Sequence, residues 1–95
     1  MKILLVDDHA VVRQGYASLL RALLPEVQVS EACDGEQALA QVQLEIPSLI
    51  IMDIGLPGID GWGVLETLKN DERTRDIPVH CFSGRDEKAK AMTLG

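Results

Sequence analysis

A short apolar run that ends in one carboxylate most constrains how this chain can fold. Residues 47–54, Pro-Ser-Leu-Ile-Ile-Met-Asp-Ile, are too few for a typical helix, and their apolar side chains are continuous rather than alternating. This pattern is typical of a strand that is covered on both faces. Because a charge inside such a strand would be left unpaired, Asp53 is expected at its carboxyl end, beside a crevice. Ligands of open α/β sheets bind in that crevice, so a ligand site is predicted at Asp53.

The rest of the chain alternates strand-like and helix-like segments. Strands are expected at residues 2–6, 27–33, 47–54 and 77–83, and helices from His9 to Pro25, from about Glu36 to Pro47, from Gly61 to Leu68, and from Arg85 to Leu94. This order predicts an α/β fold with a doubly wound parallel sheet. Such a sheet ordinarily has one more strand and helix, a deficit of roughly 25 residues. The fold is therefore expected to lack its last strand and helix.

Apolar residues at helical spacing predict which faces turn inward, and the polar segment from Asn70 to Asp76 is expected to be a solvated loop. The inward positions are Val12, Gly15, Tyr16, Leu19, Leu20 and Leu23 in the first helix, Ala38, Leu39 and Val42 in the second, and Gly61, Val64, Leu65 and Leu68 in the third.

Composition excludes several classes of function. The 95 residues carry a formal net charge of −6, which argues against a nucleic-acid surface, because phosphate binding needs clustered Lys and Arg. No apolar run approaches the length of a membrane span, and two acids interrupt the start before a secretory signal could form. A cytoplasmic protein is expected. Its two cysteines, Cys33 and Cys81, are expected to be buried reduced thiols rather than a disulfide.

Three carboxylates are expected to converge at one point of the sheet. Asp7 and Asp8 follow the strand at residues 2–6, and the doubly wound order places that strand beside the one that ends at Asp53. Like charges this close repel unless a cation compensates them, and oxygen ligands with room for water suit Mg²⁺. A magnesium site is commonly coupled to a phosphate, and an Asp carboxylate can attack phosphorus to form an aspartyl phosphate. Magnesium-dependent phosphoryl chemistry at this cluster of carboxylates is therefore predicted.

The motifs that carry this chemistry resemble those of the receiver domain of two-component response regulators. The matching segments are Ile3-Leu4-Leu5-Val6-Asp7-Asp8, Asp53-Ile54-Gly55-Leu56-Pro57-Gly58-Ile59-Asp60-Gly61 and Pro78-Val79-His80-Cys81-Phe82-Ser83-Gly84, in family order and spacing. The resemblance implies a flavodoxin-like fold with strand order 2-1-3-4, and a receiver domain over residues 1–95 that is incomplete at its carboxyl end. It also implies that Asp53 accepts a phosphoryl group from a phosphohistidine.

The resemblance further assigns ligands and partners. Asp8, Asp53 and the Gly55 carbonyl would bind Mg²⁺ directly, Asp7 would help through water, and the Ser83 hydroxyl would reach the phosphoryl group. The implied partner is a sensor histidine kinase or a phosphotransfer protein, and the domain would turn over its own phosphate but act on no metabolite. The start Asp7-Asp8-His9 with Arg13 and Gly15 is similar to a subgroup that carries a DNA-binding output domain, which would lie outside this segment.

Two rival interpretations remain beside the phosphoacceptor. In the family, a fifth strand supplies a Lys and an aromatic residue for switching, and neither falls within these 95 residues, since Lys88 and Lys90 belong to the expected fourth helix. A truncated receiver that acts as a non-switching interaction module is the alternative, and its exposed fourth-strand edge predicts self-association. A phosphatase of the dehalogenase type, with its nucleophile at Asp7, would leave Asp53 unexplained. His9 is interpreted as a surface residue at a helix start.

Overall fold

The computed structural model describes residues 1–53 and 61–82, and these form four strands and three helices. In chain order they are β1 (Lys2–Val6), α1 (Ala10–Leu23), β2 (Gln28–Ala32), α2 (Gly35–Leu44), β3 (Leu49–Asp53), α3 (Gly61–Lys69) and β4 (Val79–Phe82). The predicted fourth helix, from Arg85 to Leu94, lies outside the described residues. The other predicted elements are confirmed, with small shifts at their ends.

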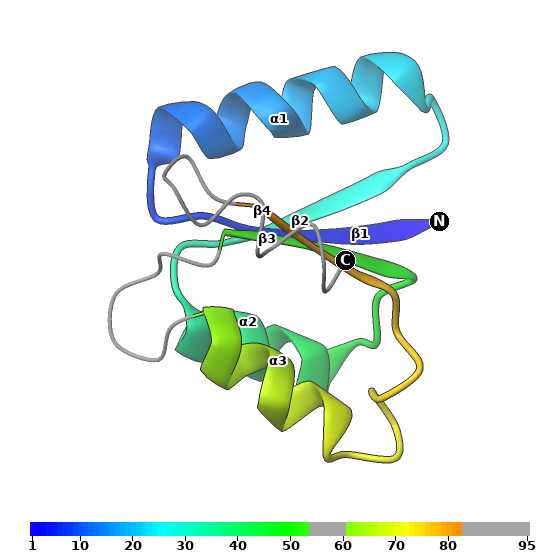
Figure 1. Cartoon of the computed structure of the whole chain (residues 1–95). Coiled ribbons are helices and arrows are strands. Elements are labelled where there is room, and N and C mark those ends of the chain that lie inside the picture. The colour runs from blue at the N-terminus through cyan, green and yellow to red at the C-terminus, as the bar shows by residue number, and fades with distance from the viewer. Residues whose placement is uncertain (54–60, 83–95) are drawn as a thin grey trace.

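The four strands form one parallel sheet in the order β2-β1-β3-β4, which confirms the doubly wound fold. Among the described helices, α1 lies on one face of the sheet, and α2 and α3 lie side by side on the other (Figure 1). Since all strands run the same way, their carboxyl ends gather at one edge, at the left of Figure 1. That edge is where a parallel sheet binds ligands.

The core lies between the sheet and the α2–α3 layer. Leu4 and Val6 of β1 and Ile50 and Met52 of β3 point to this side, because alternate residues of a strand face the same way. The helices and β4 complete the core with Ala38, Val42, Val64, Leu68, Val79 and Cys81, which are all buried. The inward faces predicted for the second and third helices are confirmed.

The opposite face of the sheet is covered much less completely than the sequence predicts. Ala17 is the one buried residue of α1, whereas Leu19 and Leu23 are 53% and 67% exposed. On β3, Ile51 points to this side and is only partly buried. Within the described residues, β3 is therefore less covered on this face than on the other, because α1 is the one described helix on this side of the sheet. An apolar groove results, lined by Tyr16, Leu19, Leu20, Leu23, Ile51, His80 and Phe82.

Two further predictions are corrected. Thr74 is buried within the segment expected to be solvated, because its hydroxyl donates to the Leu68 carbonyl at 2.6 Å and closes the end of α3. Cys33 is only partly buried, because it follows the edge strand β2, although both thiols are free as expected.

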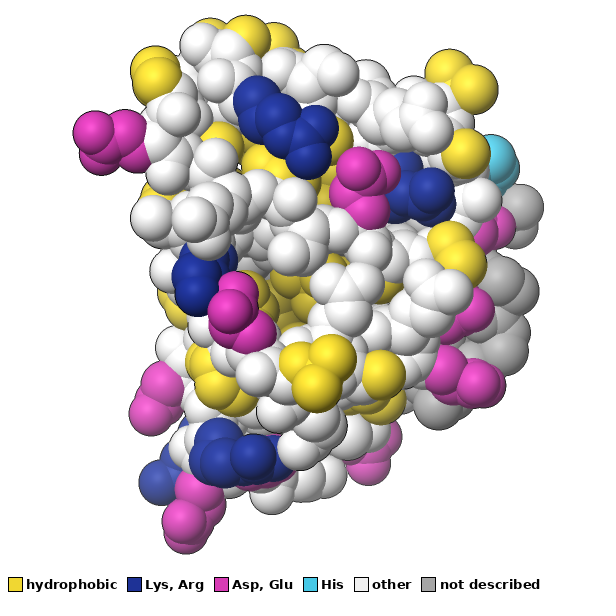
Figure 2. Space-filling view, turned by 180° about the vertical axis from the view of Figure 1, so that it is seen from behind, with side chains coloured by type: hydrophobic (Ala, Val, Ile, Leu, Met, Phe, Trp, Pro, Cys, Tyr) yellow, Lys and Arg dark blue, Asp and Glu magenta, His cyan; other side chains and the backbone are white. Residues whose placement is uncertain are grey.

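The surface carries its charges as mixed pairs on the face shown in Figure 2, where basic side chains lie near acidic ones. Lys2 Nζ lies 2.9 Å from Glu45 Oε1, and Arg13 Nε lies 2.9 Å from Glu31 Oε1. Within residues 1–53 and 61–82, no helix has the length and hydrophobicity that crossing a membrane requires.

Candidate metal-binding site at the strand ends

The pairing of β1 with β3 brings the predicted acidic residues together. Val6 lies opposite Met52 in the parallel register, so the next residues, Asp7 and Asp53, leave the sheet side by side. After Lys2, both strands are apolar up to this point and need burial, and both become acidic where the sheet ends. The register alone therefore carries two carboxylates to the same edge.

Asp7 is held from three directions. Its backbone N–H donates to the Ala32 carbonyl at 3.1 Å, and its own carbonyl accepts from Arg13 Nη1 at 2.7 Å. Its carboxylate Oδ1 accepts from the His9 backbone N–H at 2.8 Å, which turns the chain into α1. Asp7 is only 1% exposed, so its carboxylate keeps its direction because the surrounding backbone leaves it little freedom.

The four side chains of Asp7, Asp8, His9 and Asp53 form a compact cluster. Each offers one possible ligand atom, and these atoms all lie within 4.8 Å of one another. Asp7 and Asp53 are buried, whereas Asp8 and His9 open toward solvent. The structure thus brings together the three carboxylates that the sequence singles out, and it adds an imidazole.

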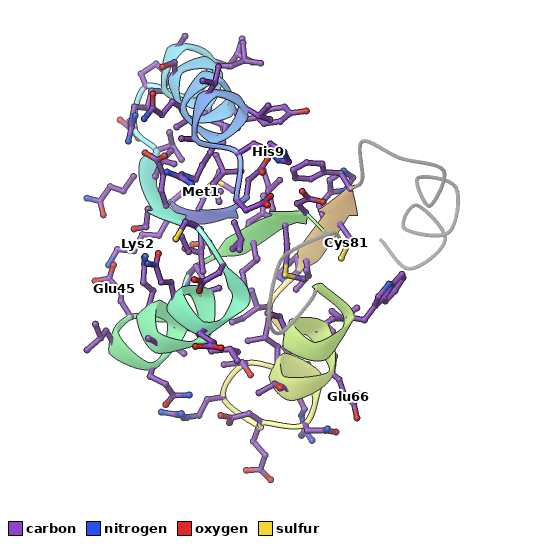
Figure 3. The ribbon with its side chains drawn as sticks, turned by 90° about the vertical axis from the view of Figure 1, so that its left-hand side faces the viewer. Met1, Lys2, His9, Glu45, Glu66 and Cys81 are labelled. Atoms are coloured by element: carbon purple, nitrogen blue, oxygen red, sulfur yellow. The ribbon has the colours of Figure 1, made fainter. Side chains whose placement is uncertain are left out.

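The contribution of His9 was missed by sequence reasoning. The residue lies at the amino end of α1, as interpreted, and 69% of its side chain is exposed. Its Nδ1, however, lies 3.1 Å from Asp8 Oδ1 and 3.4 Å from Asp7 Oδ1. Figure 3 shows His9 beneath the start of α1, at the carboxyl ends of the strands. The position of His9 directly after two acids was the one sequence signal that could have indicated its approach to the carboxylates.

The donor set fits a divalent cation. Three carboxylates within a few ångströms repel one another, and a bound cation removes that cost. Carboxylate oxygens at a solvent-open edge, where water can complete the coordination, are the ligands that Mg²⁺ prefers. Two of the predicted site residues, Gly55 and Ser83, lie outside the described residues.

The chain is similar to known receiver domains over almost its whole length. Residues 3–95 match the family model described as "Response regulator receiver domain". The chain is 46% identical over 87 residues to the transcriptional activator protein ExaE of Pseudomonas putida, covering 92% of this chain and 40% of that protein. It is 39% identical over 100 residues to the response regulator PleD of Caulobacter vibrioides, covering 99% of this chain and 21% of that protein.

A solved structure gives the same result for the fold. The amino-terminal domain of a response regulator receiver protein from Methanoculleus marisnigri superposes with a TM-score of 0.83 at 30% identity, covering 97% of this chain and 76% of that one. The chain spans less than half the length of the two curated relatives.

Proposed function

This chain belongs to the response regulator receiver domain family of two-component systems, and from that premise we propose that it accepts a phosphoryl group on Asp53 from a histidine kinase or a phosphotransfer protein. The convergence of Asp7, Asp8 and Asp53 on one edge of the sheet is the observation that carries this proposal. The output is proposed to be transcriptional, because a similar relative is a transcriptional activator.

The proposed reaction uses Asp53 as the nucleophile. Its carboxylate oxygen forms a bond to phosphorus while the P–N bond of a phosphohistidine breaks, and the leaving imidazole keeps the electron pair and takes up a proton from solvent. Asp53 is suited to this role because it comes from a rigid strand that ends at the crevice. Asp7 is the more deeply buried carboxylate and is fixed by the turn into α1, which suits it to a supporting role.

The same proposal includes a Mg²⁺ ion held by Asp8 and Asp53, by the Gly55 carbonyl, and by Asp7 through water. When bound, the ion would neutralise the charge on the transferred phosphoryl oxygens. Asp8 lies at the exposed side of the cluster, where an ion can enter with part of its water shell. The hydroxyl of Ser83 is proposed to contact the phosphoryl group.

Intact mass after incubation with a small acyl phosphate and Mg²⁺ tests the proposal. The chain should gain the mass of one phosphoryl group, and Asp53→Asn should gain none. Asp34→Asn is the matched control, because Asp34 is an aspartate at another helix start and should not change the labelling. An unmodified chain, or equal labelling of Asp53→Asn, would refute the assignment.

A second candidate function is a non-switching interaction module. The apolar groove between α1 and β4 favours it, because Tyr16 and Leu19 are exposed there although they follow the core spacing of the helix. Among the described strands, β4 is hydrogen-bonded on one side only. We propose a second copy of the chain as the partner at this edge, since an open strand edge is a template for another strand.

We also propose a cytoplasmic location for the chain, because thiols stay reduced there and both cysteines are free.

A further inference from the structure

We propose that His9 is a nitrogen ligand of the cation site and that it shifts the preference of the site from Mg²⁺ toward divalent first-row transition metals such as Co²⁺ and Mn²⁺. The inference rests on the proposed function, because it concerns the same cluster of carboxylates. It goes beyond that function by giving a specificity role to a side chain that only opens α1 in the sequence-based interpretation.

The spacing of the donor atoms is that of ligands around one ion. Metal–ligand bonds of about 2.1 Å at right angles place neighbouring ligand atoms about 3.0 Å apart. His9 Nδ1 lies 3.1 Å from Oδ1 of Asp8, a proposed direct ligand, and 3.4 Å from Oδ1 of Asp7, which is proposed to act through water. The imidazole nitrogen therefore already occupies a position from which it can bind the same cation as the carboxylates, with little movement.

The position of His9 in the helix supports the same assignment. His9 is the N-cap residue of α1, where a side chain commonly accepts a hydrogen bond from the first turn of the helix. The imidazole makes no such bond, and the His9 backbone N–H is instead tied to Asp7. The backbone is thus anchored while the ring is turned to the carboxylates, so an incoming ion would not have to break a helix cap.

Ligand chemistry then decides which cation gains. Mg²⁺ is a hard ion that prefers oxygen ligands and retains water, so it gains little from an imidazole. Transition metals of the first row bind imidazole nitrogen well, and their affinity for a mixed nitrogen and oxygen site rises from Mn²⁺ through Co²⁺. Carboxylates with one imidazole therefore form a site that discriminates against Mg²⁺ more than carboxylates alone would.

Calorimetric titration of the chain with CoCl₂ and with MgCl₂ measures this preference. His9→Gln should weaken Co²⁺ binding by about tenfold or more, the loss expected on removing a group that supports a metal, and should leave Mg²⁺ affinity nearly unchanged. His80→Gln is the matched control, because His80 is the other histidine of the chain, is exposed on β4, and should change neither affinity. Equal Co²⁺ affinity, or tighter Co²⁺ binding, in His9→Gln would overturn the proposal.

A spectroscopic measurement identifies the ligand directly. Electron spin-echo spectra of the Mn²⁺-loaded chain should show coupling to an imidazole nitrogen, which should vanish in His9→Gln and persist in His80→Gln. Spectra of the wild-type chain without nitrogen coupling would contradict the role of His9. If nitrogen coupling were absent while Asp53 still accepted a phosphoryl group with Mg²⁺, only the role of His9 would be refuted, and the proposed function would remain. Failure of the wild-type chain to bind any of these cations would refute both.

Discussion

At the scale of single residues, Asp7 combines a structural and an electrostatic role that substitution can separate. Its Oδ1 accepts the His9 N–H, and its negative charge adds to those of Asp8 and Asp53. Asp7→Asn keeps an acceptor oxygen and removes the charge. Because two charges 4 Å apart repel by about 1 kcal/mol even in water, the variant should be more stable than wild type in a chelating buffer by about that amount. Thermal unfolding with and without MgCl₂ measures both the gain in stability and the loss of Mg²⁺ binding. In Asp7→Asn, the rise in Tm on adding Mg²⁺ should be smaller than in wild type.

The control for this substitution is Asp34→Asn. Asp34 Oδ1 also accepts a backbone N–H at a helix start, from Gln37 at 2.8 Å, but it lies outside the cluster of Asp7, Asp8 and Asp53. Asn caps a helix as well as Asp does, so this variant should stay close to wild type in both buffers. A loss of stability in Asp7→Asn without divalent cations would show that repulsion among the carboxylates is not what Asp7 contributes.

The two cysteines should differ in reactivity. Burial raises the pKa of the Cys81 thiol, because its thiolate would lose hydration next to the core. Alkylation at pH 8 should therefore label Cys33 well before Cys81. The mass of each variant after equal times checks this, because Cys81→Ser keeps only Cys33 and should be alkylated faster than Cys33→Ser, which keeps only Cys81. Since the raised pKa makes the folded state retain its proton, this contribution to stability is complete below the pKa of an unfolded thiol and falls as pH rises above it. Equal labelling rates would contradict the burial of Cys81.

At the scale of elements, the sequence predicts the positions of most strands but not how far the apolar face of each helix is buried by other elements. Continuous apolar runs that end in acids locate β1 and β3, and their register then brings Asp7 to Asp53. An amphipathic pattern gives the direction of an apolar face but not whether another element lies against it, so the exposure of α1 could not be predicted. Thr74 was missed for a related reason, because a polar residue in a polar segment gives no sign that its hydroxyl will close a helix.

The end of α3 offers a test of that hydroxyl. Thr74→Val keeps the shape of the side chain and removes the hydroxyl that donates to the Leu68 carbonyl, which is left with only the longer bond from the Asp71 N–H at 3.4 Å. The free energy of unfolding in urea should fall by about 1 kcal/mol, the net contribution of a typical hydrogen bond. Thr67→Val is the control, because the exposed Thr67 hydroxyl bonds the Gly63 carbonyl at 2.9 Å within the same helix, and it should cost less than about 0.5 kcal/mol. Similar costs for the two variants would contradict the account of Thr74.

At the scale of the whole molecule, the asymmetry of the two layers predicts association. The α2–α3 layer closes a complete core, whereas α1 leaves apolar side chains in a groove beside β4, where the Tyr16 and Phe82 rings meet with centroids 5.6 Å apart. The chain should therefore form dimers at high concentration, which light scattering detects. Leu19→Glu should shift the equilibrium to monomer, because a charge cannot be buried cheaply in such a contact.

Leu44→Glu separates this effect from a general change in charge. Leu44 is 88% exposed at the end of α2, on the other side of the sheet, so the variant adds the same charge away from the groove and should still associate. A wild-type chain that remains monomeric at all concentrations, or equal loss of association in both variants, would contradict a contact through this groove.

The central claim is that carboxylates from neighbouring strands hold a divalent cation and thereby make Asp53 the phosphoryl acceptor. Incubation with an acyl phosphate, followed by borohydride reduction and peptide mass mapping, locates the modified residue directly. With MgCl₂ present, the reduced product should map to Asp53 alone, and chelation of the metal should abolish it. A product at Asp7 or Asp8, or an equal yield at Asp53 in chelator, would contradict the claim.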